Sequence, residues 1–170
     1  MTHTERIAEL TATFNASMAR FLSRLDGATP EQLTRTPDDG GWSAAQVAWH
    51  VGVINDAFAG LIDGSASNAR PAPEGFAETP WSEIAEKVPE KLVAPERFHP
   101  PAVVTSAEGL EKVRASQQRI VEALAGLDPE RAKLTVRSTI GTPINLYQVG
   151  TWAATHVARH NAQVKRLLGV

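Results

Sequence analysis

Hydrophobic residues recur at spacings of three and four in four long stretches of the chain. This is the period of an α-helix that buries one face, so each stretch predicts a helix. In chain order, the four stripes comprise Ile7, Leu10, Phe14, Met18, Phe21 and Leu25; Val47, His50, Val51, Ile54, Phe58, Leu61 and Ile62; Leu110, Val113, Gln117, Ile120, Val121, Leu124 and Leu127; and Leu146, Val149, Ala153, His156, Val157, His160, Val164, Leu167 and Leu168. Together they predict an all-α fold, a four-helix bundle.

Residues that favour helix ends flank these stripes. A capping box pairs a side chain before the helix with a glutamine or glutamate three residues later, and each satisfies a backbone amide at the start of the helix. The chain has this spacing at Thr2 and Glu5, Ser43 and Gln46, Thr105 and Glu108, and Asn145 and Gln148. A glycine, which favours a left-handed conformation at a helix end, follows each stripe at Gly27, Gly64, Gly126 and Gly169.

The connection between the second and third helices is long and rich in proline. Residues 65–105 hold seven of the eleven prolines, which excludes a long helix there. A helical turn is expected near Trp81 to Val88, after Thr79 and Pro80. A connection of about forty residues is uncommon unless it covers a site or an interface, and it permits a crossover in the bundle.

Shorter elements are predicted on either side of the main helices. Thr29-Pro30 and Asp128-Pro129 each combine a capping residue with proline at the first helical position, so both predict short helices. The segment from Thr135 to Ile140 is β-prone, but the sequence shows no obvious partner strand.

Composition narrows the class of protein. A length of 170 residues predicts one domain over residues 1–170. A formal net charge of −2 argues against non-specific nucleic-acid binding, and the absence of cysteine excludes a disulfide scaffold, a thiolate metal site and a cysteine nucleophile. No apolar run approaches the roughly 20 residues that span a bilayer, and the first residues lead into an amphipathic pattern. We therefore expect a soluble cytoplasmic protein with neither nucleic-acid nor membrane partners.

Three histidines lie on the apolar stripes. His50 is on the second stripe, and His156 and His160 are four residues apart on the fourth, so these two imidazoles stack on one helix face. A core does not need three imidazoles, because each has two polar nitrogens that must find partners. A divalent metal would satisfy three nitrogens at one point, so these residues are candidate metal ligands.

Two interpretations without a metal stay open. The histidines could be half-buried residues bonded to the backbone or to water, or they could lie on the surface if the helix is phased differently. His3 and His99 have no helical partner and are expected on the surface or in loops, although His99 could reach the mouth of the site from the long connection.

The segment from Gly41 to His50 (Gly-Trp-Ser-Ala-Ala-Gln-Val-Ala-Trp-His), with His156 to Gln163 (His-Val-Ala-Arg-His-Asn-Ala-Gln), resembles the DinB-like superfamily of metal-binding four-helix bundles. The resemblance covers nearly the whole chain. It implies that His50, His156 and His160 bind a divalent ion, nickel or zinc, and that the protein is a homodimer. Some relatives are thiol-dependent enzymes, namely bacillithiol transferases and mycothiol-dependent maleylpyruvate isomerases.

Three neutral histidines on a metal leave open coordination positions, which is typical of a catalytic site. The hypothesis is a metal-dependent enzyme that acts on a small-molecule substrate, a thiol-dependent S-transferase or a hydrolase, with a low-molecular-weight thiol as a candidate co-substrate. The alternatives are a non-catalytic protein that binds a metal or small ligand, and a metal-free helical interaction module. The sequence shows no carboxylate on the stripes that would serve as an acid or base.

Six further residues are candidates for supporting the ligands or lining the pocket: Ser17, Trp42, Trp49, Gln117, Trp152 and Gln163. Each has a structural alternative, since a core amide bonded to a neighbouring helix or an aromatic residue in the core fits the same pattern. Arg114, Arg119 and Arg159 lie off the stripes and are interpreted as solvated, with Arg159 next to the proposed ligands.

Overall fold

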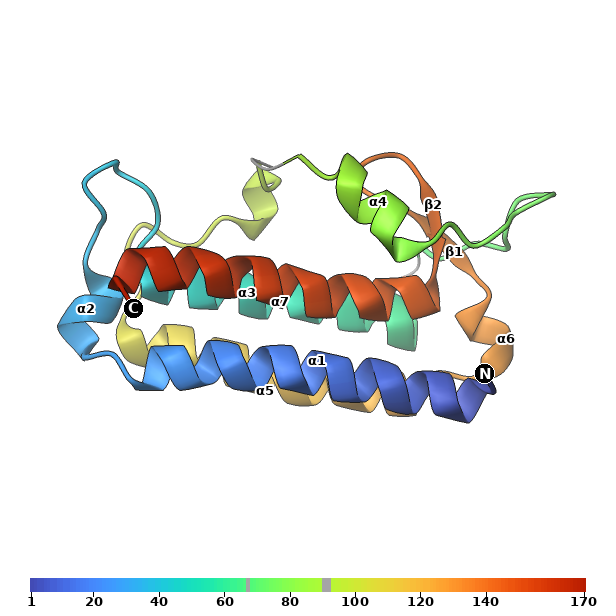
Figure 1. The fold of residues 1–170 in the computed structure, drawn as a ribbon, viewed down its shortest axis with the longest axis horizontal. Coiled ribbons are helices and arrows are strands. Elements are labelled where there is room, and N and C mark those ends of the chain that lie inside the picture. Colours follow the sequence, from blue (N-terminus) through green and yellow to red (C-terminus); the bar gives the residue numbers. More distant parts are fainter. Residues whose placement is uncertain (67, 90–92) are drawn as a thin grey trace.

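Four long helices form the body of the protein in the computed structural model, which describes residues 1–66, 68–89 and 93–170 (Figure 1). They are α1 (His3–Asp26), α3 (Ala44–Asp63), α5 (Ser106–Ala125) and α7 (Leu146–Leu168). Helices α1 and α3 each pack against both α5 and α7. The predicted all-α four-helix bundle is confirmed. In the part of the chain that the structure describes, no helix is long and apolar enough to cross a membrane.

The helix directions show that the long connection is a crossover. In Figure 1, α3 and α5 both start at the end of the bundle where α1 finishes, so these two neighbours run in the same direction. The chain after α3 must therefore return along the whole bundle before α5 begins. It does so over the outer side of α3 and α7, and it contains α4 (Trp81–Lys87) and the short 3₁₀-helix η1 (Glu96–Phe98).

The short elements match the expected helices and add a strand. Helices α2 (Pro30–Thr34) and α6 (Pro129–Ala132) both begin at the predicted prolines. The β-prone segment forms β1 (Thr135–Arg137), which pairs antiparallel with β2 (Pro143–Asn145). The sequence conceals this partner because β2 is only three residues long and runs directly into the cap of α7.

The helix ends confirm the four predicted capping boxes, but only two of the four predicted left-handed glycines. All four predicted boxes have both of their hydrogen bonds. Gly64 and Gly169 are left-handed, with φ of 91° and 70°. Gly27 and Gly126 are right-handed, with φ of −78° and −88°, so the predicted left-handed cap is wrong there. In both cases the chain enters the next short helix within three residues, and it continues without the reversal that a left-handed residue supplies.

Helices α3 and α5 approach each other closely. A Cβ added to Gly109 would lie 2.6 Å from the carbonyl oxygen of Ala45, and one added to Gly52 would lie 2.9 Å from that of Lys112. Between the same helices, the buried Asn55 donates from Nδ2 to Oγ of Ser116 at 3.1 Å. This side of α3 is therefore filled by the neighbouring helix.

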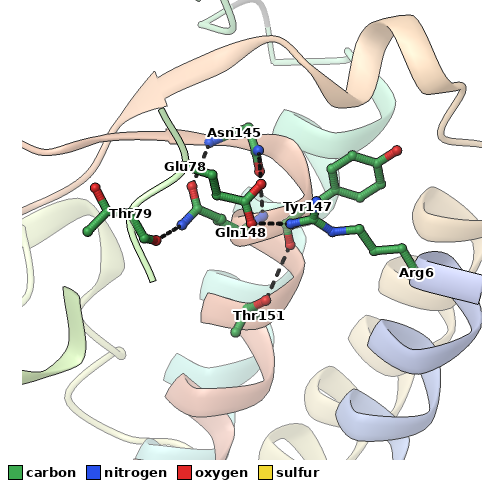
Figure 2. A network of polar contacts seen from close by, with 7 residues as sticks. All are labelled: Arg6, Glu78, Thr79, Asn145, Tyr147, Gln148 and Thr151. Atoms are coloured by element: carbon green, nitrogen blue, oxygen red, sulfur yellow. Dashed lines mark hydrogen bonds and ion pairs between the residues drawn. The ribbon is translucent and has the colours of Figure 1, made fainter. Parts of the chain in front are cut away.

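The crossover is tied down where α7 begins (Figure 2). Glu78 forms an ion pair with Arg6 of α1 and accepts a hydrogen bond from Nδ2 of Asn145 at 2.7 Å. The carbonyl oxygen of Thr79 accepts from Nε2 of Gln148 at 2.7 Å. Asn145 and Gln148 are also the capping box of α7, so the same side chains start this helix and fix the crossover just before α4.

A second capping residue holds the other end of the crossover. Gln46 uses its Oε1 in the capping box of α3, and its Nε2 donates to the carbonyl oxygens of Pro101 and Ala102 at 2.9 and 3.1 Å. The crossover is thus anchored at both ends on helix starts. Its central part, with α4 and η1, is held over α3 and α7.

Candidate metal centre

The structure brings the three stripe histidines together where α3 packs against α7. The ring centroid of His50 lies 5.4 Å from that of His156 and 5.0 Å from that of His160. The rings of His156 and His160, one helical turn apart, are 4.5 Å apart. One nitrogen from each of the three residues lies within 4.8 Å of the others. The predicted convergence of two helices on one point is therefore present.

Hydrogen bonds to Nδ1 orient two of the three rings. Nδ1 of His50 contacts the carbonyl oxygen of Phe98, in η1, at 2.8 Å. Nδ1 of His160 contacts Oε1 of Gln163, one turn further along α7, at 2.7 Å. An oxygen of this kind only accepts, so both Nδ1 atoms are the donors and both Nε2 atoms keep a free lone pair. Such outer hydrogen bonds are how proteins fix the ring of a metal-binding histidine.

His156 completes the cluster in a different way. Its Nε2 lies 3.1 Å from Nε2 of His160. Its Nδ1 is buried with no partner among the described residues. Of the three histidines, His156 is thus the one whose ring is not oriented by a hydrogen bond of Nδ1 within the described part of the chain.

All three imidazoles are held in the neutral form. Burial lowers the pKa of His50, and burial with the neighbouring His160 and His50 lowers the pKa of His156 well below its usual range. For His160, burial and then the nearby His50 lower the pKa to about 4, against the opposing effect of its bond to Gln163. Neutral imidazole is the form that binds metal, so no proton has to be removed from a histidinium near pH 7.

The donor set fits a divalent transition ion. Two nitrogens bound to one ion at about 2.1 Å lie about 3.4 Å apart in a tetrahedral site. The Nε2 atoms of His156 and His160 already have nearly this separation, at 3.1 Å. Within residues 1–66, 68–89 and 93–170, this is the only group of histidines or carboxylates that meets the geometry of a metal site.

The comparison with protein families agrees with this geometry. The family model of the DinB superfamily matches residues 13–164. The chain belongs to the DinB superfamily. Membership in the DinB superfamily and the three-histidine cluster together fit a metal-binding protein. A search of curated proteins finds no match.

A cavity of about 1080 Å³ opens beside the cluster, and all three histidines line it. Trp42 packs against His50 with ring centroids 4.9 Å apart, and Trp152 packs against Phe58 at 5.5 Å. The crossover also lines the cavity, with Trp81 of α4 and Phe98 of η1. This DinB-superfamily bundle therefore has its histidines in the wall of a chamber that is also lined by aromatic side chains.

Three of the six supporting candidates lie at the site. Gln163 accepts the hydrogen bond from His160, while Trp42 and Trp152 line the cavity. The other three lie elsewhere. Nε2 of Gln117 donates to Asn15 of α1, and Ser17 accepts from Arg20 within α1.

Trp49 is the third candidate that lies away from the cluster. It lines a separate hollow with residues of α5, because it is one residue, and hence about 100° of helix rotation, before His50. Helix rotation therefore turns Trp49 away from the histidines.

The remaining histidines and arginines mostly follow expectation. His99 is exposed in the crossover, where Nε2 contacts the carbonyl oxygen of Ala94 at 2.7 Å and its ring lies 5.6 Å from Trp42. Arg114 and Arg119 form ion pairs with Asp26 and Asp63.

Arg159 differs from the expectation of a solvated side chain. It lines the cavity, its Nη2 donates to the carbonyl oxygen of Pro89, and its charge is among the causes that lower the pKa of His156 and His160.

The sequence did not reveal the contributions of the crossover. Phe98 orients a histidine through its backbone oxygen, and Trp81, Arg97 and Arg70 line the cavity. A carbonyl oxygen has no sequence signature, and residues of an irregular segment have no period that tells which way they point. The only available signal was the unusual length of the crossover.

Proposed function

We propose that this DinB-superfamily chain is a metal-dependent enzyme in which His50, His156 and His160 hold a divalent transition ion, nickel or zinc. The observation that carries the proposal is the convergence of three neutral imidazoles, two of them oriented through Nδ1, at the wall of a cavity. Three protein ligands leave positions for a substrate, which is typical of catalytic rather than structural metal sites.

The bound ion would make a water or thiol more acidic and so a better nucleophile near pH 7. The residues of the chain prepare the place for this chemistry. Phe98 and Gln163 fix the rings of His50 and His160. The aromatic side chains of Trp42 and Trp152 line the chamber beside the histidines.

We propose thiol-dependent S-transfer or hydrolysis as the reaction class, with a low-molecular-weight thiol as co-substrate in the first case. The chain has no cysteine of its own, so a thiol at this site would come from a co-substrate. We further propose that residues 1–170 act as one domain and that the protein works in the cytoplasm, as its length and composition suggest. The resemblance supports the proposal that it is a homodimer.

A second candidate function is non-catalytic binding of a metal or small ligand. One observation favours it: among the described residues that line the cavity, none is an aspartate or glutamate that could serve as a general acid or base. This candidate predicts metal binding without turnover in a screen of thiols and electrophiles, whereas the proposed enzyme predicts turnover that depends on the metal.

The metal site is tested by elemental analysis of untagged protein purified without chelator. We expect about one equivalent of nickel or zinc per chain. The variants His50→Ala, His156→Ala and His160→Ala should each lose it while circular dichroism shows the helices intact. Protein that lacks metal and fails to take up added nickel or zinc would contradict the proposal and would favour a metal-free interaction module.

A further inference from the structure

The charged side chains that line the cavity all have the same sign. Four arginines line it, and among the described lining residues there is no aspartate or glutamate. The whole chain has more acidic than basic residues, 19 against 17, so composition does not explain this selection. The arginines come from separate segments: Arg70 follows α3, Arg97 lies in η1, Arg137 in β1 and Arg159 in α7.

Two of these arginines, Arg97 and Arg137, keep N–H donors that can bind a ligand. The guanidinium of Arg97 lies 4.6 Å from the centre of the Phe98 ring, a contact that uses one face and no N–H group. Nε of Arg137 donates to the carbonyl oxygen of Gly141 at 3.3 Å. Neither residue has an ion pair with another residue that the structure describes. Because a guanidinium has five N–H donors, each keeps the paired donors that bind a carboxylate or phosphate.

The remaining walls suit an apolar group. Trp42, Trp81, Trp152 and Phe58 present aromatic surface to the same cavity. A volume of about 1080 Å³ is slightly above the usual range for small-molecule sites.

We propose that the cavity binds a small organic anion with an apolar body, and that Arg97 and Arg137 recognise its charged group. This inference rests on the proposed function, because the anion would be the substrate held beside the metal. The charged group is a carboxylate or a phosphate, since both match the paired donors of arginine.

The experiment compares two fluorescent probes of the same shape. Anilinonaphthalene sulfonate carries a negative charge, whereas phenylnaphthylamine is its neutral counterpart. A sulfonate is also a poor metal ligand, so its binding reports on the arginines. We expect wild-type protein to bind the sulfonate at least about tenfold more tightly than the neutral probe, a preference that weakens with added salt.

The double variant Arg97→Gln/Arg137→Gln should remove most of this preference. Its sulfonate Kd should rise about tenfold, while the Kd of the neutral probe stays within about twofold. Arg166→Gln, an exposed arginine of α7 outside the cavity, is the matched control and should change neither value. The variant Arg97→Lys/Arg137→Lys keeps the charge and should retain part of the preference. Circular dichroism and the neutral probe check that each variant is folded.

Competition then separates the two sources of charge. Displacement of the sulfonate probe by naphthoate would assign a carboxylate, and displacement by naphthyl phosphate would assign a phosphate ester. Displacement by neutral naphthol alone would overturn the proposal, as would equal affinity for the two probes or an unchanged sulfonate Kd in the double glutamine variant.

Metal content measured on the same samples keeps the two proposals apart. An arginine-dependent preference in protein that takes up no metal would support the anion site and contradict the proposed enzyme. Equal binding of both probes by metal-loaded protein would overturn the anion site and leave the metal site standing.

Discussion

Helix α3 has two buried polar side chains, and they face different surroundings. Asn55 faces α5, where it bonds to Ser116 in a region that two close glycine contacts hold shut. His50 faces α7, where it meets His156 and His160 at the wall of a cavity. Each cluster also contains a buried polar atom with no described partner, Oδ1 of Asn55 and Nδ1 of His156.

The difference shows that burial of a polar group is not by itself a sign of function. Asn55 lies where α3 and α5 pack closely and bonds to Ser116 of α5, so it contributes to packing and to the choice of helix neighbours. The side toward α7 combines convergent ligand atoms, neutral protonation states and free volume. That combination, rather than the presence of polar residues in the core, distinguishes the candidate site.

The largest expected effect is stabilisation by metal. At a free metal concentration about a thousand times the Kd, the free energy of unfolding should rise by about 4 kcal/mol relative to chelator-treated protein. Calorimetric scans with nickel or zinc, and with chelator, measure this increment. His156→Ala should show none of it.

Asn55→Ala is the control for the other side of α3. The variant should lose about 2 kcal/mol of stability because the substitution leaves a cavity and a broken hydrogen bond. Added metal should still raise its free energy of unfolding as much as in the wild type. A variant that lost both would show that the two sides of α3 are not independent.

The next largest effect should be the change with pH in the free energy of unfolding of the metal-free protein. The folded state holds the three histidines neutral, with the pKa of His160 at about 4 against 6.5 ordinarily. The free energy of unfolding should therefore be highest above about pH 6.5. It should decrease as the pH falls toward 4, by about 3 kcal/mol from His160 alone, because the unfolded chain binds a proton that the folded protein does not.

Urea unfolding at several pH values, with chelator present, checks this dependence. His160→Gln should flatten the profile, whereas Asn55→Ala should lower stability at every pH and keep the slope. The same slope in His160→Gln as in the wild type would show that His160 is not held neutral by burial.

The smallest expected effect tests the closed side of α3. Gly109→Ala places a Cβ 2.6 Å from the backbone oxygen of Ala45 and should cost about 2 kcal/mol, because the backbones must separate. Gly126→Ala is the matched control: it adds a Cβ 3.5 Å from the nearest oxygen, at a right-handed residue, and should be neutral or slightly stabilising. Equal stability of the two variants in chemical unfolding would contradict the close approach of α3 and α5.

The main helices and their starts could be predicted from the sequence because their determinants are local. Stripes at helical spacing and capping boxes act within a few residues, and the structure confirms them. The convergence of the histidines could also be predicted, since His156 and His160 share a helix face and His50 lies on the apolar stripe of α3.

Other features depend on how distant segments meet, which the stripes do not determine. Gln117 lies on the stripe of α5 but faces α1, so its amide bonds to Asn15. The carbonyl oxygen of Phe98 and the side chain of Arg97 reach the site only because the crossover is pinned at Glu78 and Gln46. Those anchors join residues 55 or more positions from their partners, and no local pattern reveals such pairs.

The most direct test of the metal site is a crystal structure of nickel- or zinc-loaded protein with anomalous data at the absorption edge of the metal. The account predicts one strong anomalous peak per chain, about 2.1 Å from a ring nitrogen of each of His50, His156 and His160. A peak bound elsewhere, or one that contacts only the pair on α7 while His50 keeps both nitrogens on protein partners, would contradict it.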